Sequence, residues 1–311
     1  MILRKKTLKV IGIDIGSTMI KMVEVFFADT PKLIKWACVD IPSVNTTASP
    51  DHGKEVIGAI KMCLRQLKPS TRKASICLSD PAVIIKELSM PSMGEKEMLE
   101  NIRFELSEYF SADLKEFRLS YRLFRENGIV NKGNISVLVA AAPVSLLSRY
   151  RHIVKKGGCD LKYIDVPANC VSKLLTKGVN GGISGGFHKS EVICIVDLGV
   201  NNIEVSIYEG SNFRLNRTTA ASGQNYDESV VYELTQVIDY YHRKNYELRI
   251  SKIVLIGGKS YTDGLAEHIS KQISLPVEVA RPEMFEAFGE IKEDFPMALY
   301  FKALGSAIRE D

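Results

Sequence analysis

Apolar residues in the first forty positions form three short runs that predict consecutive strands. The runs cover residues 8–14, 19–27 and 33–40, are rich in Val, Ile and Phe, and are separated by turn residues. This arrangement is typical of an antiparallel meander. Apolar positions at helical spacing follow at about 53–67, and the run 74–78 predicts a further strand.

The middle of the chain has a different pattern, which predicts a small β-α-β-β-α unit. The expected elements are a strand at 83–88, a helix at 95–110, strands at 117–124 and 135–142, and a helix at 144–156. Met98 and Ile102 mark the apolar face of the first of these helices. A short strand at 163–166 and a helix at 168–176 then resume the earlier pattern. The unit is therefore expected to be an insertion.

A glycine-rich segment at 178–187 resembles a phosphate-binding loop in its composition. It lacks the Lys-Ser/Thr pair of a P-loop, and it follows a helix where a P-loop would follow a strand. We interpret the segment as a flexible linker between two domains.

An internal repeat is the most informative feature of the sequence. Residues 10–24 and 193–207 align without a gap, and in each an apolar strand ends in Asp before a glycine turn and a second apolar strand. Asp14 aligns with Asp197, and the glycines two residues later also align. A single Asp-x-Gly is common at hairpin turns, but two copies that each open a domain-sized half indicate a duplicated fold.

The residue types at these turns suit a nucleotide. Glycine lets the backbone approach an anion, and amides and hydroxyls of the turn can donate to phosphate oxygens. The two aspartates can hold a hydrated Mg²⁺ between the halves, and a third turn of two glycines after a strand leaves room for a base or ribose. The candidate nucleotide-binding residues are Asp14, Gly16, Ser17, Thr18, Lys21, Asp197, Gly199, Asn201, Gly257 and Gly258, with Asp14 and Asp197 as the magnesium residues. For Lys21, a contact with phosphate and a solvated position at the strand end both remain open.

Composition excludes some functions. A net charge of +4 over 311 residues is weak, so we expect no nucleic-acid partner. The six cysteines form no CxxC pair and no zinc-like spacing with histidine, which favours reduced thiols and a cytoplasmic compartment. No stretch approaches the ~20 apolar residues that span a bilayer. We therefore expect a cytoplasmic protein that would reach a membrane only through a partner.

On these motifs the sequence resembles the PilM family of type IV pilus assembly, within the superfamily of actin, MreB and FtsA. Residues 12–24 look like the phosphate-1 motif, and 86–93 with 101–105 look like the inserted 1C subdomain shared by PilM and FtsA. Shorter matches to PilM proteins lie at 138–143, 157–158, 164–166, 240–241, 256–258 and 303–305. The resemblance implies an α/β, actin-like (ribonuclease H-like) duplicated two-domain fold with an inserted subdomain.

The resemblance also implies a division of the chain. We expect subdomain 1A at 1–84 plus 159–178, with 298–311 packing back on it, subdomain 1C at 85–158, and domain 2 at 187–297. Other actin-like proteins carry a 2B subdomain before the Gly-Gly turn, whereas here a single helix at 227–243 fills that interval. Subdomain 2B is therefore expected to be reduced or absent.

In function, the resemblance implies a scaffold of the type IV pilus inner-membrane assembly complex. PilM-like proteins bind the cytoplasmic tail of the membrane protein PilN in a groove between subdomains 1A and 1C. We expect a PilN-like tail as the partner here, with Met98 and Ile102 in its binding surface. The pilus motor or other pilus assembly components, and self-association, are further expected contacts.

Departures from the family pattern weaken the expected nucleotide site. Val200, Asn201 and Asn202 stand where MreB-like proteins carry further glycines and threonines. Val166 precedes Pro167 where FtsA and MreB have a Glu-Pro pair near the catalytic water, and Asp165 would point to the opposite face of its strand. We therefore expect weak or vestigial binding of ATP and Mg²⁺ and assign no catalytic residue. The alternatives are a functional actin-like ATPase that drives pilus assembly and an FtsA-like cell-division protein.

Overall fold

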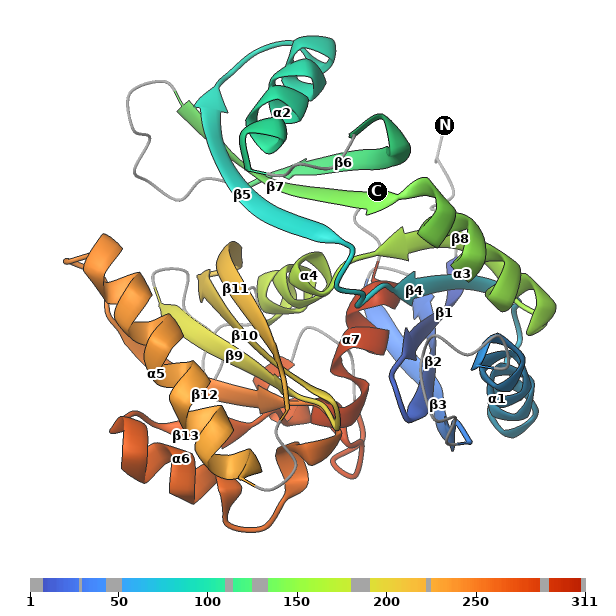
Figure 1. Cartoon of the computed structure of the whole chain (residues 1–311). Helices are drawn as coiled ribbons and strands as arrows, with labels where there is room; N and C mark the ends of the chain where they lie inside the picture. The colour runs from blue at the N-terminus through green and yellow to red at the C-terminus, as the bar shows by residue number, and fades with distance from the viewer. Residues whose placement is uncertain are drawn as a thin grey trace, which may run out of the picture.

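The computed structural model describes residues 8–27, 30–42, 52–109, 114–124, 134–179, 191–221, 225–285 and 291–308. Two lobes are each built on a five-stranded sheet, and a smaller three-stranded sheet lies beside them (Figure 1). The predicted linker at 178–187 falls, after its first two residues, outside the described residues.

The first lobe begins with the predicted meander. Its strands are β1 (Leu8–Ile15), β2 (Met19–Phe27), β3 (Pro31–Asp40), β4 (Lys73–Cys77) and β8 (Asp160–Asp165). They lie in the order β3-β2-β1-β4-β8, with β1, β2 and β3 antiparallel and with β4 and β8 parallel to β1. Helix α1 (His52–Leu67) buries Val56, Ile60 and Cys63 against this sheet.

The second lobe repeats this plan. Its strands are β9 (Val192–Leu198), β10 (Asn202–Glu209), β11 (Asn212–Ala220), β12 (Ile250–Ile256) and β13 (Val277–Val279). Their order, β11-β10-β9-β12-β13, matches that of the first sheet position by position, which confirms the duplication predicted from the internal repeat. Helices α5 (Tyr226–Lys244) and α6 (Leu265–Ile273) pack on this sheet. In the described part of the interval between β11 and β12, α5 is the one helix.

The inserted unit forms the third sheet. It consists of β5 (Ile84–Pro91), α2 (Glu95–Tyr109), a short 3-10 turn η1 (Leu114–Glu116), β6 (Phe117–Leu123) and β7 (Asn134–Pro143). The strands are antiparallel in the order β5-β7-β6. The apolar face of α2 supplies Met98, Ile102 and Leu106 to a core that it shares with this sheet.

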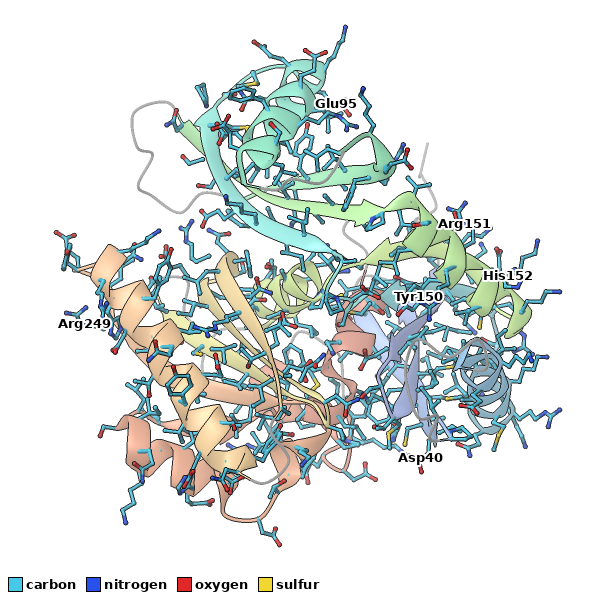
Figure 2. All side chains as sticks on the ribbon, in the orientation of Figure 1. Asp40, Glu95, Tyr150, Arg151, His152 and Arg249 are labelled. Carbon is cyan, nitrogen blue, oxygen red and sulfur yellow. The ribbon has the colours of Figure 1, made fainter. Side chains whose placement is uncertain are left out.

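Helix α3 (Val144–Lys156) differs from the predicted assignment, which placed it in the inserted unit. Its buried residues Ile153 and Val154 join the core of the first lobe, together with residues of α1 and β1. Figure 2 places Tyr150 of this helix beside the first lobe, whereas Glu95 at the start of α2 lies on the inserted unit. Apolar spacing shows which face of a helix is buried but not which sheet it covers.

Two further helices connect the lobes. Helix α4 (Pro167–Val179) follows β8, and α7 (Met297–Ala307) runs through the centre of the molecule between the two large sheets (Figure 1). A Cβ at Gly12 would lie 2.0 Å from the carbonyl oxygen of Ala303, so only glycine allows α7 to pack this closely on β1. Strand β8 begins three residues earlier than the strand expected at 163–166. Within the described residues, no helix is both long and apolar enough to cross a bilayer.

Candidate nucleotide site

The first Asp-x-Gly turn joins β1 to β2. The amide of Gly16 donates to the carbonyl of Met19 at 3.0 Å, which closes a tight hairpin. Asp14 and Lys21 face each other across the two strands, and the Lys21 ammonium donates to Asp14 Oδ2 at 3.0 Å. Lys21 is not solvated at the strand end, because its side chain is paired with the buried Asp14 and is 12% exposed. Its contact with a phosphate stays a prediction.

The second turn, between β9 and β10, has the same hydrogen bond. The amide of Gly199 donates to the carbonyl of Asn202 at 3.0 Å, and the hydroxyl of Tyr226 donates to the carbonyl of Gly199 at 2.9 Å. The glycine amide of each turn is thus used within its own hairpin. Asp197 lies in β9, two residues before the glycine, as Asp14 does in β1.

The third turn packs directly on the second. Gly257 has a φ of 92°, and a Cβ there would lie 2.4 Å from Asp197 Oδ1, so both its conformation and its surroundings require glycine. Its amide donates to the carbonyl of Ala298 at the start of α7, at 2.9 Å. Gly258 is exposed and begins the short 3-10 turn η2 (Gly258–Tyr261).

Lys302 of α7 completes the site and was missed by the sequence analysis. Its ammonium lies 2.6 Å from Asp197 Oδ2 and 3.7 Å from Asp14 Oδ1, between the two aspartates. It is the sole charged residue among the eleven of α7, and a lone lysine in an otherwise apolar, glycine-containing helix was the available signal. We call Asp14, Asp197 and Lys302 the interlobe site.

The charges of this site stabilise one another. Burial acts to lower the pKa of Lys302, but the carboxylates of Asp14 and Asp197 raise it well above its ordinary value. Burial acts to raise the pKa of Asp14, but Lys21 and Lys302 hold it below its ordinary value. Lys302 is therefore an ammonium and Asp14 a carboxylate at neutral pH. Nearby, burial and then Asp197 raise the pKa of Glu204, which faces Asp197 across β9 and β10.

The predicted site residues thus divide into two groups. Asp14, Lys21, Asp197 and Gly257 meet at the interlobe site, and Gly16 and Gly199 shape the two hairpins beside it. The residues exposed on the turns are Ser17, Thr18, Asn201 and Gly258. The second group keeps hydroxyl and amide groups that a phosphate could reach.

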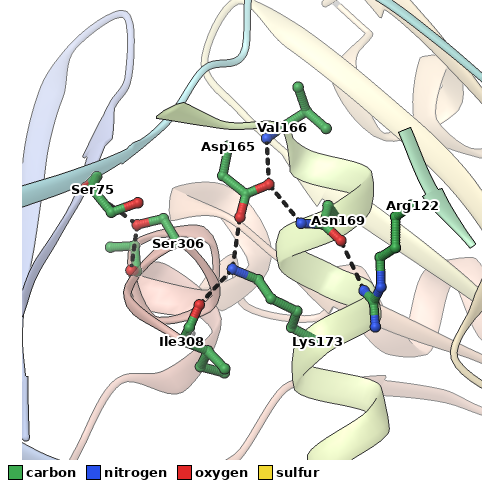
Figure 3. A network of polar contacts seen from close by, with 9 residues as sticks. Ser75, Arg122, Asp165, Val166, Asn169, Lys173, Ser306 and Ile308 are labelled. Carbon is green, nitrogen blue, oxygen red and sulfur yellow. Dashed lines mark hydrogen bonds and ion pairs between the residues drawn. The ribbon is translucent and has the colours of Figure 1, made fainter. Parts of the chain in front are cut away.

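The carboxylate of Asp165 is occupied by contacts with residues outside the interlobe site. Its carboxylate accepts hydrogen bonds from the Lys173 ammonium at 2.6 Å, the Asn169 amide at 2.9 Å and the Val166 amide at 2.8 Å (Figure 3). Lys173 also donates to the carbonyl of Ile308 at 2.8 Å. The carboxylate therefore ties β8 to α4, and through Lys173 to the end of α7.

The residues of the interlobe site do not fit a magnesium ion as they are placed. The predicted hydrated Mg²⁺ would need the space beside Asp197 for itself and its water, whereas the Lys302 ammonium occupies that space, 2.6 Å from Asp197 Oδ2. A divalent ion between the two aspartates would be repelled by Lys302 and by Lys21. Among the described residues, no group of three His, Cys, Asp or Glu side chains is placed to hold a metal.

The prediction that Met98 and Ile102 belong to a partner-binding surface was wrong. Met98 is 3% exposed and Ile102 is fully buried. Both side chains lie in the core between α2 and the sheet of their own unit, because the apolar face of the helix packs on that sheet. A partner would have to unfold the inserted unit to reach them.

The repeated strand order, the two facing Asp-x-Gly turns and the Gly-Gly turn define a protein of the actin-like fold. The family model described as type IV pilus assembly protein PilM matches residues 12–235, and the chain belongs to that family.

A solved structure described as a PilM-PilN type IV pilus biogenesis complex has this fold. It is similar with a TM-score of 0.79 at 20% identity, over 96% of this chain and 98% of that chain. The ethanolamine utilization protein EutJ of Carboxydothermus hydrogenoformans is more distant, with a TM-score of 0.49 at 14% identity over 98% and 90% of the two chains.

Proposed function

We propose that this protein is a cytoplasmic scaffold of the type IV pilus inner-membrane assembly complex, held at the membrane by the tail of a PilN-like protein. The observation that carries the proposal is membership of the PilM family. It is supported by the similarity of almost the entire chain to a chain from a PilM-PilN complex. Contacts with the pilus motor or other assembly components, and self-association, belong to the same proposal.

The partner surface lies on the inserted unit in this proposal, on residues other than those first expected. Phe104 of α2 and Leu123 of β6 are large apolar side chains that are 64% and 52% exposed. Strands β5 and β6 are the edges of the three-stranded sheet, and an edge strand can pair with an extended peptide. Strand β6 also reaches the first lobe, since Arg122 donates to Asn169 of α4 at 2.8 Å. A tail bound along β6 would therefore contact both the inserted unit and the first lobe.

Binding of a fluorescent PilN-like tail peptide to the full chain, followed by anisotropy, tests this surface. We expect Phe104→Ser or Leu123→Ser to weaken binding about tenfold or more if the side chain is an apolar anchor. Met62→Ser on α1 is the matched control, since Met62 is 53% exposed but lies outside the inserted unit. Unchanged affinity of both variants would show that the binding surface lies elsewhere. A wild-type chain that does not bind the tail would overturn the proposed partner.

For nucleotide, we propose weak or vestigial ATP and Mg²⁺ binding without enzymatic turnover. The support is chemical: both aspartates are neutralised by lysines, and the turn that carries Asn201 lacks hydroxyl donors. The glycine amides of both hairpins already donate within their turns. These features favour a scaffold over the alternatives of an actin-like ATPase and an FtsA-like protein.

A further inference from the structure

Lys302 lies outside both aspartate turns, yet it contacts the aspartate of each lobe. Its ammonium is 2.6 Å from Asp197 Oδ2 and 3.7 Å from Asp14 Oδ1. A third contact is the hydroxyl of Ser79, at 3.4 Å. The ammonium thus stands between two carboxylates that belong to different sheets.

The helix that carries Lys302 packs by backbone contact on the first lobe, and its first turn also accepts a hydrogen bond from Gly257 of the second lobe at 2.9 Å. A Cβ on Gly12 of β1 would lie 2.0 Å from the carbonyl oxygen of Ala303, and one on Gly305 would lie 2.5 Å from that of Cys170 in α4. The backbone of α7 therefore touches β1 and α4 directly, and such close packing leaves little freedom for the helix to shift. Lys302 extends from this rigid element to a carboxylate of the second lobe.

The contact is strong because its members are largely shielded from water. The side chains of Lys302 and Asp197 are 14% and 15% exposed, and that of Asp14 is 1% exposed. Hydrogen bonds between charged groups are roughly twice as strong as those between neutral ones. Lys21 occupies the other oxygen of Asp14 at 3.0 Å. Two ammonium groups therefore balance the two carboxylates.

A divalent ion at this place would have to displace Lys302. An ion bound to Asp197 at about 2.0–2.1 Å would lie next to the ammonium and be repelled by it. Mg²⁺ must also lose strongly held water before it binds. The Lys302 ammonium, in contrast, belongs to the folded chain and needs no separate binding step.

We propose that Lys302 is a built-in substitute for the divalent ion and that it holds the two lobes together with neither nucleotide nor Mg²⁺ bound. The arrangement of the lobes in this structure is then the resting state of the protein. This inference rests on the interlobe site alone, and it stands whether or not the chain binds a PilN-like tail.

Thermal unfolding of the full chain in EDTA and in millimolar MgCl₂ tests the substitution. The wild-type midpoint is expected to be the same in both buffers within about 1 °C, because an ion that does not bind the folded state cannot stabilise it. Lys302→Met is expected to unfold several degrees lower in EDTA and to regain part of the loss in MgCl₂, as the freed aspartates take up the ion. Lys302→Arg keeps the charge, so its unfolding midpoint in EDTA is expected to fall less and not to rise in MgCl₂.

The matched control is Lys259→Met. Lys259 follows the Gly-Gly turn and stacks 4.1 Å from the ring centroid of Tyr226. Its loss should leave the midpoint insensitive to MgCl₂, as in the wild-type chain. A wild-type midpoint that rises with MgCl₂, or a Lys302→Met chain that does not respond to it, would overturn the proposal.

A second variant keeps the inference testable if Lys302→Met does not fold. Asp197→Asn removes only the carboxylate of the second lobe and leaves Lys302 paired with Asp14. Small-angle X-ray scattering in EDTA is expected to give a larger radius of gyration for Asp197→Asn than for the wild-type chain. Equal radii for the two chains, or a wild-type radius that shrinks on addition of MgCl₂, would show that Lys302 does not hold the lobes.

Discussion

Arg214 of β11 forms an ion pair with Glu87 of β5, so that an edge strand of the inserted sheet is tied to an edge strand of the second lobe. The same guanidinium lies 2.6 Å from Glu209 Oε2 of β10. Burial acts to lower the pKa of Arg214, but the two carboxylates raise it, so the guanidinium remains charged. Like Lys302, Arg214 is a cation shared between carboxylates of two sheets.

Replacement of Arg214 should loosen the inserted unit. Arg214→Met is expected to lower the free energy of unfolding by about 1–3 kcal/mol, because Glu87 and Glu209 lose a partly buried charged partner. Arg217→Met on the same strand is the control. Its ion pair with Glu233 is half exposed at the arginine, so the loss should stay below about 1 kcal/mol. Urea denaturation measures both, and equal losses would show that the Arg214 pair is not a structural tie.

The Asp165–Lys173 pair is expected to affect the free energy of unfolding more than the Arg214 ion pairs do, because its two side chains are only 8% and 4% exposed. Lys173→Met should lower the free energy of unfolding by roughly 3–5 kcal/mol, since it leaves a buried carboxylate without its counter-ion. Asp165→Asn combined with Lys173→Met should be less damaging than Lys173→Met alone, because no unpaired charge remains. Guanidinium denaturation compares the three chains. A double variant less stable than Lys173→Met would contradict this account.

Stability should fall in acid partly through Asp14. The folded chain holds the pKa of Asp14 below its ordinary value of 3.8, so the folded state takes up this proton less readily than the unfolded state. The contribution of Asp14 is therefore fully present above about pH 4 and is lost as the pH falls through the lowered pKa. Urea denaturation at several pH values should show the stability gap between wild type and Asp14→Asn shrinking in acid.

The control for this titration is Asp160→Asn. Asp160 pairs with Lys162 at the surface, where the two side chains are 53% and 45% exposed. Its substitution should cost less than about 1 kcal/mol at neutral pH. A stability gap for Asp14→Asn that is independent of pH would mean that its carboxylate does not stabilise the fold through charge.

ATP binding in the presence of Mg²⁺ should be weaker than about 100 μM, because hydrogen bonds to a charged phosphate contribute about 1.5–3 kcal/mol each and several donors are missing. Isothermal titration of ATP and a phosphate-release assay on the full chain measure affinity and turnover. Micromolar affinity together with turnover that Asp197→Ala abolishes would place the protein among the ATPases.

The local pattern of the sequence was sufficient for most elements and for the duplication. Helix α1 (His52–Leu67) begins and ends within a residue of the helix predicted at 53–67, and the aligned Asp14 and Asp197 both contact Lys302 between the lobes. These features follow from short-range periodicity and from a repeated turn, both of which can be recognised in the sequence alone.

Tertiary structure decided which surfaces face each other. Met98 and Ile102 would form an apolar helix face both in a partner-binding surface and in a core. Only the packing shows that this face covers the sheet of its own unit. The same holds for α3, which the sequence pattern assigned to the inserted unit and whose buried residues lie in the core of the first lobe.

The occupant of the interlobe site was also a tertiary result. The sequence determined that two aspartates come from equivalent turns of a duplicated fold, and it placed Lys302 far from both along the chain. Only the packing of α7 on Gly12 of β1 brings the lysine ammonium between those carboxylates. The physical reason is that a single charged residue leaves no repeating pattern in the sequence. Its ion-pair partners are therefore decided by which distant segments of the backbone pack together, and not by its neighbours along the chain.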